Sequence, residues 1–260
     1  MTTAVTQAPA ADTRHVDVLI AGAGISGIGS AYHLQEQCPG KSYLILEMQD
    51  SFGGTWKTHK YPGVRSDSDL YTFGYRFKPW LGAPIASAEE ILKYMGEVID
   101  ENGIDEHILY GHRIARCSWS SEDNLWTIEA TRLSDDAPVT VTCNFLWMCQ
   151  GYYDHEKPYI PDWKGMDSYQ GQFVHAQLWD PDTDYSGKRV LVIGSGATAA
   201  TVIPAFAEKA EHVTMLQRSP TYFFCSENKN ELADQLREIG IDEPTIHRVV
   251  RAQIMYDPVS

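Results

Sequence analysis

The sequence has little of what would mark a membrane, secreted or nucleic-acid-binding protein. No apolar run reaches the roughly 18 to 20 residues that a helix needs to cross a bilayer. Residues 1–15 lack the basic start and apolar centre of a secretory signal, and we expect them to form a disordered leader. Basic residues are scarce: 21 Lys and Arg stand against 35 Asp and Glu, a formal net charge of −14. Together these features predict a cytoplasmic protein with no transmembrane segment and no nucleic-acid partner.

Paired cysteines are also missing. The five cysteines form no C-x-x-C motif, and no group of His and Cys has the spacing of a zinc site. We therefore predict reduced, mostly structural thiols and no metal site. The absence of C-x-x-C also argues against a disulfide reductase, which would need a redox-active cysteine pair beside its flavin. The cysteines are Cys38, Cys117, Cys143, Cys149 and Cys225.

Two glycine-rich loops are the strongest positive feature. The first is Gly-Ala-Gly-Ile-Ser-Gly at residues 22–27, and the second is Gly-Ser-Gly-Ala-Thr-Ala at residues 194–199. Each lies between a short apolar run and a helix-like segment, which is the order of elements in a dinucleotide-binding β-α-β unit. One such loop is a weak indication. Two of them predict that one protein holds two dinucleotides, as when a nicotinamide reduces a flavin.

The first loop has each residue that binding an adenine dinucleotide requires. Gly22 permits a tight turn, Gly24 lets a pyrophosphate approach, and Gly27 allows close packing of helix on strand. The helix N-terminus then supplies amide donors. Glu47 ends the next predicted strand, where a carboxylate can accept both ribose hydroxyls and would repel a 2′-phosphate. This loop should therefore hold FAD or NAD; the alternative is a glycine turn without a ligand.

The second loop has no acid at the corresponding place. Its return strand ends in Leu-Gln-Arg-Ser at residues 216–219, and Arg218 with Ser219 suits a 2′-phosphate through charge-assisted hydrogen bonds. We expect NADPH here, although Arg218 as an ordinary surface arginine is the alternative. The loop residues expected at this cofactor are Gly194, Ser195, Gly196, Ala197, Thr198 and Ala199.

These patterns predict an α/β fold with two Rossmann-like dinucleotide-binding domains, the second incomplete. We assign residues 16–151 to an FAD-binding domain, 152–187 to an interdomain linker and 188–260 to a partial NADPH-binding domain. Three strand candidates within 107–147 predict an antiparallel insert that leads back to the main sheet. Residues 50–84 are rich in Gly, Pro, Tyr and Trp without clear periodicity, and such a stretch inside a domain is usually functional.

Two sequence motifs lie between the loops. Residues 54–67 fit G-x-W-x(4)-[FY]-P-[GM]-x(3)-D, which we call the first motif. Residues 169–180 fit F-x-G-x(3)-H-x(3)-W-[PD], with Tyr169 in place of the leading Phe, and form the second motif. With the two loops, they resemble the type I Baeyer–Villiger flavin monooxygenases, and most closely the ethionamide-activating group of actinobacterial enzymes. The resemblance covers roughly residues 16–225.

The resemblance implies an FAD- and NADPH-dependent monooxygenase. In the family, NADPH reduces FAD and dioxygen then forms a peroxide at flavin carbon 4a. This peroxide inserts one oxygen atom into a ketone, giving an ester or lactone, or oxygenates a sulfide or thioamide. One alternative is a flavin monooxygenase that oxygenates only nitrogen or sulfur, a group that usually lacks Trp179 and Asp180. The other is an inactive, truncated FAD- and NADP-binding fragment.

The chain departs from the family in length. Family members are about twice as long, so the chain resembles their N-terminal half, and no residue here matches the motif of their catalytic arginine. Arg248 and Arg251 are not convincing substitutes for it.

The resemblance also implies roles for single residues. Ser26 and Glu47 would contact the FAD diphosphate and ribose. Asp67 is the candidate catalytic residue, expected to orient an arginine that stabilises the anionic intermediate; the alternative is an Asp that only caps a turn. The remaining expected positions are Thr55 and Trp56 facing the flavin, Ile114 near adenine, Arg65 and Ser66 beside Asp67 on the nicotinamide side, and Gly171, His175 and Trp179 in the interdomain link.

Overall fold

The first strand is longer than its apolar run predicts. The computed structural model describes residues 12–223 and 226–256, so residues 1–11 of the predicted leader and Cys225 lie outside the described residues. β1 (Asp12–Ala21) already contains the last four leader positions, which corrects the predicted start at Val16. The cause is the partner strand: β6 (Ala137–Met148) pairs with β1 along its whole length, from Asp12 beside Val139 to Ala21 beside Met148.

The chain divides into two compact units. Unit 1 comprises residues 1–54 and 95–152, and unit 2 comprises residues 55–94 and 153–260. The chain therefore leaves unit 1 inside the first motif and returns within helix α4 (Ala88–Glu101). The predicted domains kept residues 55–94 with the first nucleotide loop, whereas these residues cluster with the second. The assignment of a cofactor to each region stays a prediction.

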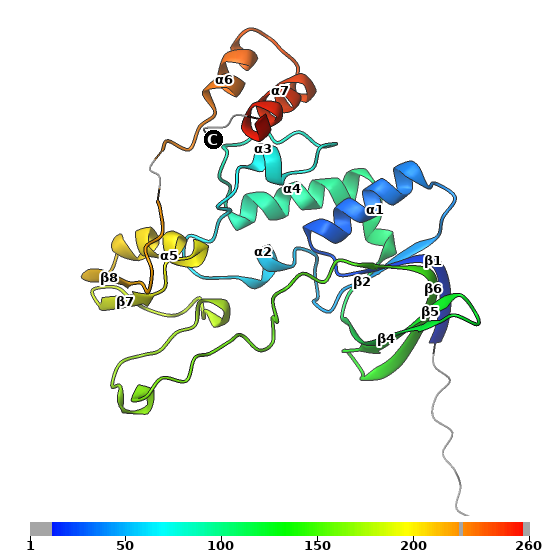
Figure 1. Ribbon diagram of the computed structural model, residues 1–260, viewed down its shortest axis with the longest axis horizontal. Helices are drawn as coiled ribbons and strands as arrows, with labels where there is room; N and C mark the ends of the chain where they lie inside the picture. The colour runs from blue at the N-terminus through cyan, green and yellow to red at the C-terminus, as the bar shows by residue number, and fades with distance from the viewer. Residues whose placement is uncertain (1–11, 224–225, 257–260) are drawn as a thin grey trace, which may run out of the picture. The chain divides into compact units, whose positions relative to one another are not determined.

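Unit 1 is built on a six-stranded sheet in the order β3-β2-β1-β6-β5-β4. β1 runs parallel to β2 and β6, while β6, β5 and β4 form an antiparallel meander (Figure 1), which confirms the predicted insert. The strands around β1 and β6 are β2 (Tyr43–Leu46), β3 (Ile108–Leu109), β4 (His112–Ser120) and β5 (Leu125–Arg132).

The apolar run of β1 explains its central place in the sheet. Leu19 and Ile20 point to opposite faces and are both fully buried, as expected for a parallel strand covered on both sides. Burial of each such side chain stabilises the fold by roughly 1.5–3 kcal/mol. α1 (Ile25–Gln37) lies against this sheet, and its buried positions are mostly small, which lets the helix approach closely. They are Gly27, Ile28, Gly29, Ser30, Ala31 and Leu34. The short 3-10 helix η1 (Ile104–His107) precedes β3.

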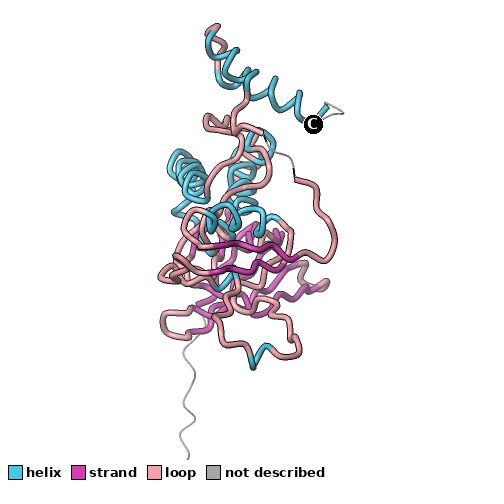
Figure 2. The backbone as a smooth tube through the Cα atoms, turned by 90° about the vertical axis from the view of Figure 1, so that its left-hand side faces the viewer, coloured by secondary structure: helices cyan, strands magenta, loops and turns pink. Residues whose placement is uncertain are grey.

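Unit 2 contains the second β-α-β unit. β7 (Arg189–Ile193) pairs in parallel with β8 (His212–Leu216), and α5 (Ala197–Ala207) connects them, as the sequence predicted. Val190 and Val192 pack toward Phe206 of this helix. Among the described residues of unit 2, two short helices precede this β-α-β unit, and two helices follow it. Two 3-10 helices interrupt the long stretch before β7, which is mostly loop (Figure 2). These are α2 (Thr55–Thr58), α3 (Leu70–Phe73), η2 (Met166–Ser168), η3 (Ala176–Leu178), α6 (Glu231–Glu238) and α7 (Glu243–Tyr256).

Arginines join α6 and α7 to α3. Arg251 Nη1 donates to the carbonyl oxygens of Tyr71, at 3.0 Å, and Thr72, at 2.8 Å. Arg237 donates to both carboxylate oxygens of Glu243 and to the Tyr71 hydroxyl. The Arg251 guanidinium is thus bound to backbone carbonyls of α3. No described helix is long and apolar enough to span a membrane.

Candidate functional site at two glycine-rich loops

The first loop is so tight that two of its glycines cannot be replaced without a clash. Gly22 has a φ of 101° and its amide donates to the Leu46 carbonyl at 2.8 Å. A Cβ on Gly27 would lie 1.9 Å from the Gly22 carbonyl oxygen. Gly54 of the first motif closes on the loop, because its own Cβ would lie 3.2 Å from the Gly24 Cα. The glycines therefore leave the backbone of residues 22–27 without a side-chain cover.

The N-terminus of α1 is suited to an anion. Its first intrahelical hydrogen bond runs from the Ile28 amide to the Gly24 carbonyl, so the amides of Gly24, Ser26 and Gly27 have no carbonyl one turn earlier in the helix. The first turn contains no acidic residue, and Ser26 is exposed. The helix dipole adds positive potential at this end. A dinucleotide pyrophosphate fits this donor set.

Glu47 is built into the loop. It is only 7% exposed, and its Oε2 accepts from the Ala23 amide at 2.7 Å while Oε1 accepts from the Gln49 amide at 2.8 Å. A carboxylate oxygen accepts more than one hydrogen bond, so both oxygens keep a lone pair for further donors. The sequence predicted a carboxylate at this strand end but not that the same carboxylate holds the loop backbone.

Ile114 lies on β4 next to an irregularity. The pairing of β4 with β5 shifts register between Ile114 and Arg116, so the intervening residue departs from the regular ladder. The Ile114 side chain packs against the core cluster of the sheet. Its predicted backbone contact with adenine stays a prediction.

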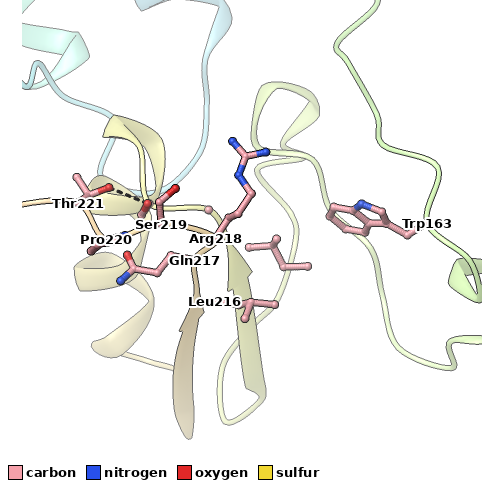
Figure 3. A pocket seen from close by; sticks show the side chains of 10 residues that line it. Trp163, Leu216, Gln217, Arg218, Ser219, Pro220 and Thr221 are labelled. Carbon is pink, nitrogen blue, oxygen red and sulfur yellow. Dashed lines mark hydrogen bonds between the residues drawn. The ribbon is translucent and has the colours of Figure 1, made fainter.

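The second loop borders a cavity of about 570 Å³. Gly194 has a φ of 125° and its amide donates to the Leu216 carbonyl at 2.8 Å, which repeats the geometry of the first loop. Ser195 and Thr221 join the loop to the end of β8 through their hydroxyls, 2.8 Å apart. A Cβ on Gly196 would meet no atom within 4 Å, so the loop is open on this side. The cavity is lined by Trp163, Ile193, Gly194, Ser195, Leu216, Gln217, Arg218, Ser219, Pro220 and Thr221 (Figure 3).

The structure brings Arg218 and Ser219 to the same cavity as the glycine loop, and their role toward a 2′-phosphate stays a prediction. Trp163 also lines it, from a segment 31 residues before Gly194, and in the view of Figure 3 it stands across from Thr221. Sequence reasoning missed Trp163, because an indole in an irregular stretch carries no periodic signal. The three remaining loop positions begin α5, and among them Ala199 is buried where the first loop has Gly27.

The first motif packs against α5. Tyr61 is buried beside Val202 and Phe206, and its side chain hydrogen-bonds with that of Thr198, while burial raises the pKa of the Tyr61 phenol. Gly63 has a φ of 75°, and a Cβ there would lie 3.2 Å from the Thr201 carbonyl oxygen. The centre of the first motif thus packs against α5. The spacing of the motif did not predict this contact.

The candidate catalytic Asp67 is exposed and accepts from the Ser68 hydroxyl at 3.3 Å. The cap of α3 is Asp69, which accepts from the Tyr71 amide at 2.8 Å, so capping this helix is not the role of Asp67. Ser66 is buried, and its hydroxyl accepts from the amide of Ala86 at 3.1 Å.

Three other predicted residues lie near these elements. Arg65 is exposed and forms an isolated bridge with Ser87. Thr55 and Trp56 begin α2, and the Trp56 ring meets that of Phe73 edge-on at 5.8 Å. The roles of these residues toward a cofactor stay predictions.

The second motif is held by its own ring contacts. A Cβ on Gly171 would lie 2.4 Å from the Tyr169 ring, so the tyrosine folds over this glycine. His175 Nδ1 accepts from the Gln177 amide at 3.2 Å and caps η3. Trp179 packs against Phe206, with ring centroids 5.5 Å apart. Within unit 2 the motif is thus anchored to α5, whereas its coupling to domain movement stays a prediction.

The described cysteines and acidic groups fit neither a disulfide nor a metal. Cys38, Cys117, Cys143 and Cys149 are free. Within residues 12–223 and 226–256, no group of three or more His, Cys, Asp or Glu is arranged to hold a metal ion.

Two β-α-β units, each with a glycine loop at a helix N-terminus, define a protein with two Rossmann-like nucleotide-binding sites. Residues 20–80 match the NAD(P)-binding Rossmann-like domain, and residues 85–232 match the flavin-binding monooxygenase-like family. The second match covers more than half of the sequence, and the chain belongs to the flavin-binding monooxygenase-like family. The predicted fold class is confirmed.

Named relatives agree with this family. The FAD-containing monooxygenase EthA of Mycolicibacterium smegmatis is 52% identical over 212 residues, which cover 81% of this chain and 43% of the relative. The probable FAD-binding monooxygenase AlmA of Acinetobacter baylyi is 40% identical over 242 residues, 92% of this chain and 48% of the relative. The resemblance to flavin monooxygenases is confirmed. The chain spans less than half the length of these relatives.

Solved structures extend the likeness to nucleotide complexes. A steroid monooxygenase bound to NADP is similar with a TM-score of 0.68 and 31% identity, over 80% of this chain and 39% of that chain. OTEMO in complex with FAD and NADP has a TM-score of 0.66 and 32% identity over the same shares.

Proposed function

We propose that this chain binds FAD at residues 22–27 and NADPH at residues 194–199, as part of a flavin monooxygenase. Its reaction inserts one oxygen atom of dioxygen into a ketone, a Baeyer–Villiger oxidation, or oxygenates a sulfide or thioamide. The observation that carries the proposal is the opposite charge at two equivalent places: Glu47 follows β2 and Arg218 follows β8, each beside its glycine loop. Relatives and similar structures named for FAD and NADP support it.

At the first loop, the chain binds and orients an adenine dinucleotide. The amides at the start of α1 hold its pyrophosphate, and the Glu47 carboxylate accepts from its ribose hydroxyls. The same carboxylate disfavours a 2′-phosphate, since two anions would then meet in a poorly solvated place. This selects FAD over NADP at this loop.

At the second loop, the chain selects a phosphorylated ribose. Arg218 offers a planar set of donors that matches phosphate oxygens, and Ser219 adds a hydroxyl on the same cavity. The 194–199 amides then hold the pyrophosphate as the first loop does. Trp163, which also lines the cavity, supplies apolar surface.

Bound flavin and nicotinamide supply hydride transfer and the activation of dioxygen. The exposed carboxylate of Asp67 has no reacting proton to remove in this scheme. We assign it the orientation of a cationic side chain that stabilises developing negative charge. The free thiols favour a reducing compartment, and we place the protein in the cytoplasm.

The proposal is tested by nucleotide binding to the full chain. Adenosine 2′,5′-bisphosphate should bind more tightly than 5′-AMP by calorimetry, and Arg218→Ala should remove roughly tenfold or more of that preference. Arg189→Ala, an exposed arginine on β7, is the matched control and should leave the preference unchanged. Equal affinities of the unmodified chain for the two nucleotides would contradict the NADPH assignment.

A second experiment tests flavin reduction and oxygen insertion. In FAD-loaded protein, NADPH should reduce the flavin faster than NADH does. A ketone incubated with labelled dioxygen should then yield an ester that carries one labelled oxygen atom. Oxygenation of amines or sulfides with no ester from any ketone would instead favour the nitrogen- or sulfur-oxygenating alternative. No oxygenation with either class of substrate would favour a binding fragment.

A further inference from the structure

A cluster of aromatic and histidine rings surrounds the buried side chain of His59 in unit 2. His59 is only 6% exposed, and its ring centroid lies 5.6 Å from that of Tyr61, 5.1 Å from Tyr153 and 6.3 Å from His155. Tyr61 and His59 belong to the first motif, whereas Tyr153 and His155 begin the long loop stretch that leads to the second motif. The cluster is therefore a contact between two segments that are far apart in the sequence.

Two ring nitrogens in this contact have no partner. Among the described residues, His59 Nε2 and His155 Nδ1 are buried without a hydrogen bond. A neutral imidazole can leave a lone pair there, but a protonated ring carries an N–H at both positions. Protonation of His59 would thus bury both a charge and an unsatisfied donor. Burial lowers the pKa of His59, and the charges of His155 and His175 lower it further.

The surrounding charges do not offset a proton on His59. On its own segment the nearest charged residues are Lys57 and Lys60, which are cationic. On the opposite segment, one oxygen of Asp154 already accepts from two backbone amides of its own turn. The charge of Asp67 acts on the neighbouring tyrosine. Burial and the neighbouring positive charges therefore oppose protonation of His59.

The two ends of the segment that bears His155 are joined by a hydrogen bond. Gln177 Nε2 donates to the Asp154 carbonyl oxygen, which ties the start of the segment to η3 near its end. Just beyond, Trp179 packs on Phe206, a contact without a titratable group. Residues 153–178 thus begin at the histidine contact, and the Trp179–Phe206 contact that follows them does not depend on pH.

We propose that His59, packed against Tyr153 and His155, forms a pH-sensitive latch that holds residues 153–178 against the first motif when His59 is neutral and releases them when His59 is protonated. Because the pKa of His59 is lowered in the packed state, the released state binds more protons. The latch is therefore at full strength above the ordinary histidine pKa near 6.5, and it weakens as the pH falls below that value.

Hydrogen exchange in the full chain tests the latch. Protection factors, corrected for the pH dependence of intrinsic exchange, should fall in residues 57–64 and 153–178 between about pH 8 and about pH 5.5. The expected loss approaches tenfold for each pH unit below the titration. His59→Phe fills the same space without a titratable group and should make the protection independent of pH. His212→Gln, at an exposed position on β8, is the control and should behave like the unmodified chain.

Different results of this experiment support or overturn the latch. Protection that does not change with pH in the unmodified chain overturns the latch, as does an unchanged pH dependence in His59→Phe. An equal loss of protection in β1, which belongs to unit 1, would show global unfolding and also overturn the latch. If His59→Phe does not fold, His155→Phe removes one of the charges that lower the pKa of His59. A reduced pH dependence in that variant supports the latch, and an unchanged one overturns it.

Discussion

Glu47 offers the sharpest test of how the first loop is held. Its two carboxylate oxygens accept from the backbone amides of Ala23 and Gln49 at 2.7 and 2.8 Å, and the side chain is almost fully buried. Glu47→Gln keeps the shape but replaces one oxygen by an NH₂ group. That group is a donor, so one of the two amides must face a donor in place of an acceptor.

The cost follows from the strength of these bonds. A hydrogen bond to a charged group contributes roughly 1.5–3 kcal/mol, and a buried amide left without an acceptor adds to the loss. We expect Glu47→Gln to lower the free energy of unfolding by about 2–3 kcal/mol. For a chain of this size, that corresponds to a fall in Tm of roughly 4–12 °C.

Two measurements separate the structural role of Glu47 from its role toward the ribose. Thermal unfolding of FAD-free protein, followed by circular dichroism, reports the first; retention of yellow FAD through gel filtration reports the second. Glu36→Gln, at an exposed position on α1, should change neither. An unchanged Tm in Glu47→Gln would refute the loop-holding role. A lower Tm with undiminished FAD affinity would refute the ribose contact.

Two further predictions concern unit 1. Gly27→Ala should destabilise the fold by about 2–4 kcal/mol and abolish FAD retention, because the new Cβ would meet the Gly22 carbonyl oxygen. Gly40→Ala is the control and should be neutral, because a Cβ there has open space around it. Equal unfolding midpoints of the two variants in denaturant would contradict this prediction. Lys41, above all, holds the pKa of Asp17 well below its usual range. This stabilisation is present above about pH 4 and disappears as the pH falls, so Asp17→Asn should lower the urea midpoint at about pH 7 and much less at about pH 2.

The regular elements around the two loops followed from local patterns. The apolar run before each glycine loop and the helical spacing after it identified both β-α-β units, because each signal depends on residues close in sequence. The start of β1 was wrong, since strand length depends on the partner β6 rather than on the apolar run alone.

Only some residues of the candidate site could be predicted from the sequence. Arg218 and Ser219 followed from their place at a strand end, where chain direction fixes which side chains meet the loop. Trp163 did not, because it reaches the same cavity through an irregular stretch. The packing of Tyr61 against α5 could not be predicted either, because the spacing of a motif identifies its residues but not the surface against which they pack.

By itself, the sequence determined that two dinucleotide loops exist and that their strand ends carry opposite charges, because glycine geometry and formal charge are properties of the residues themselves. Only the tertiary structure decided that the Glu47 carboxylate also holds the first loop, that residues 55–94 cluster with the second nucleotide unit, and that the buried His59 lies against His155. Each of these depends on contacts between segments distant in sequence, which packing selects and local pattern does not encode.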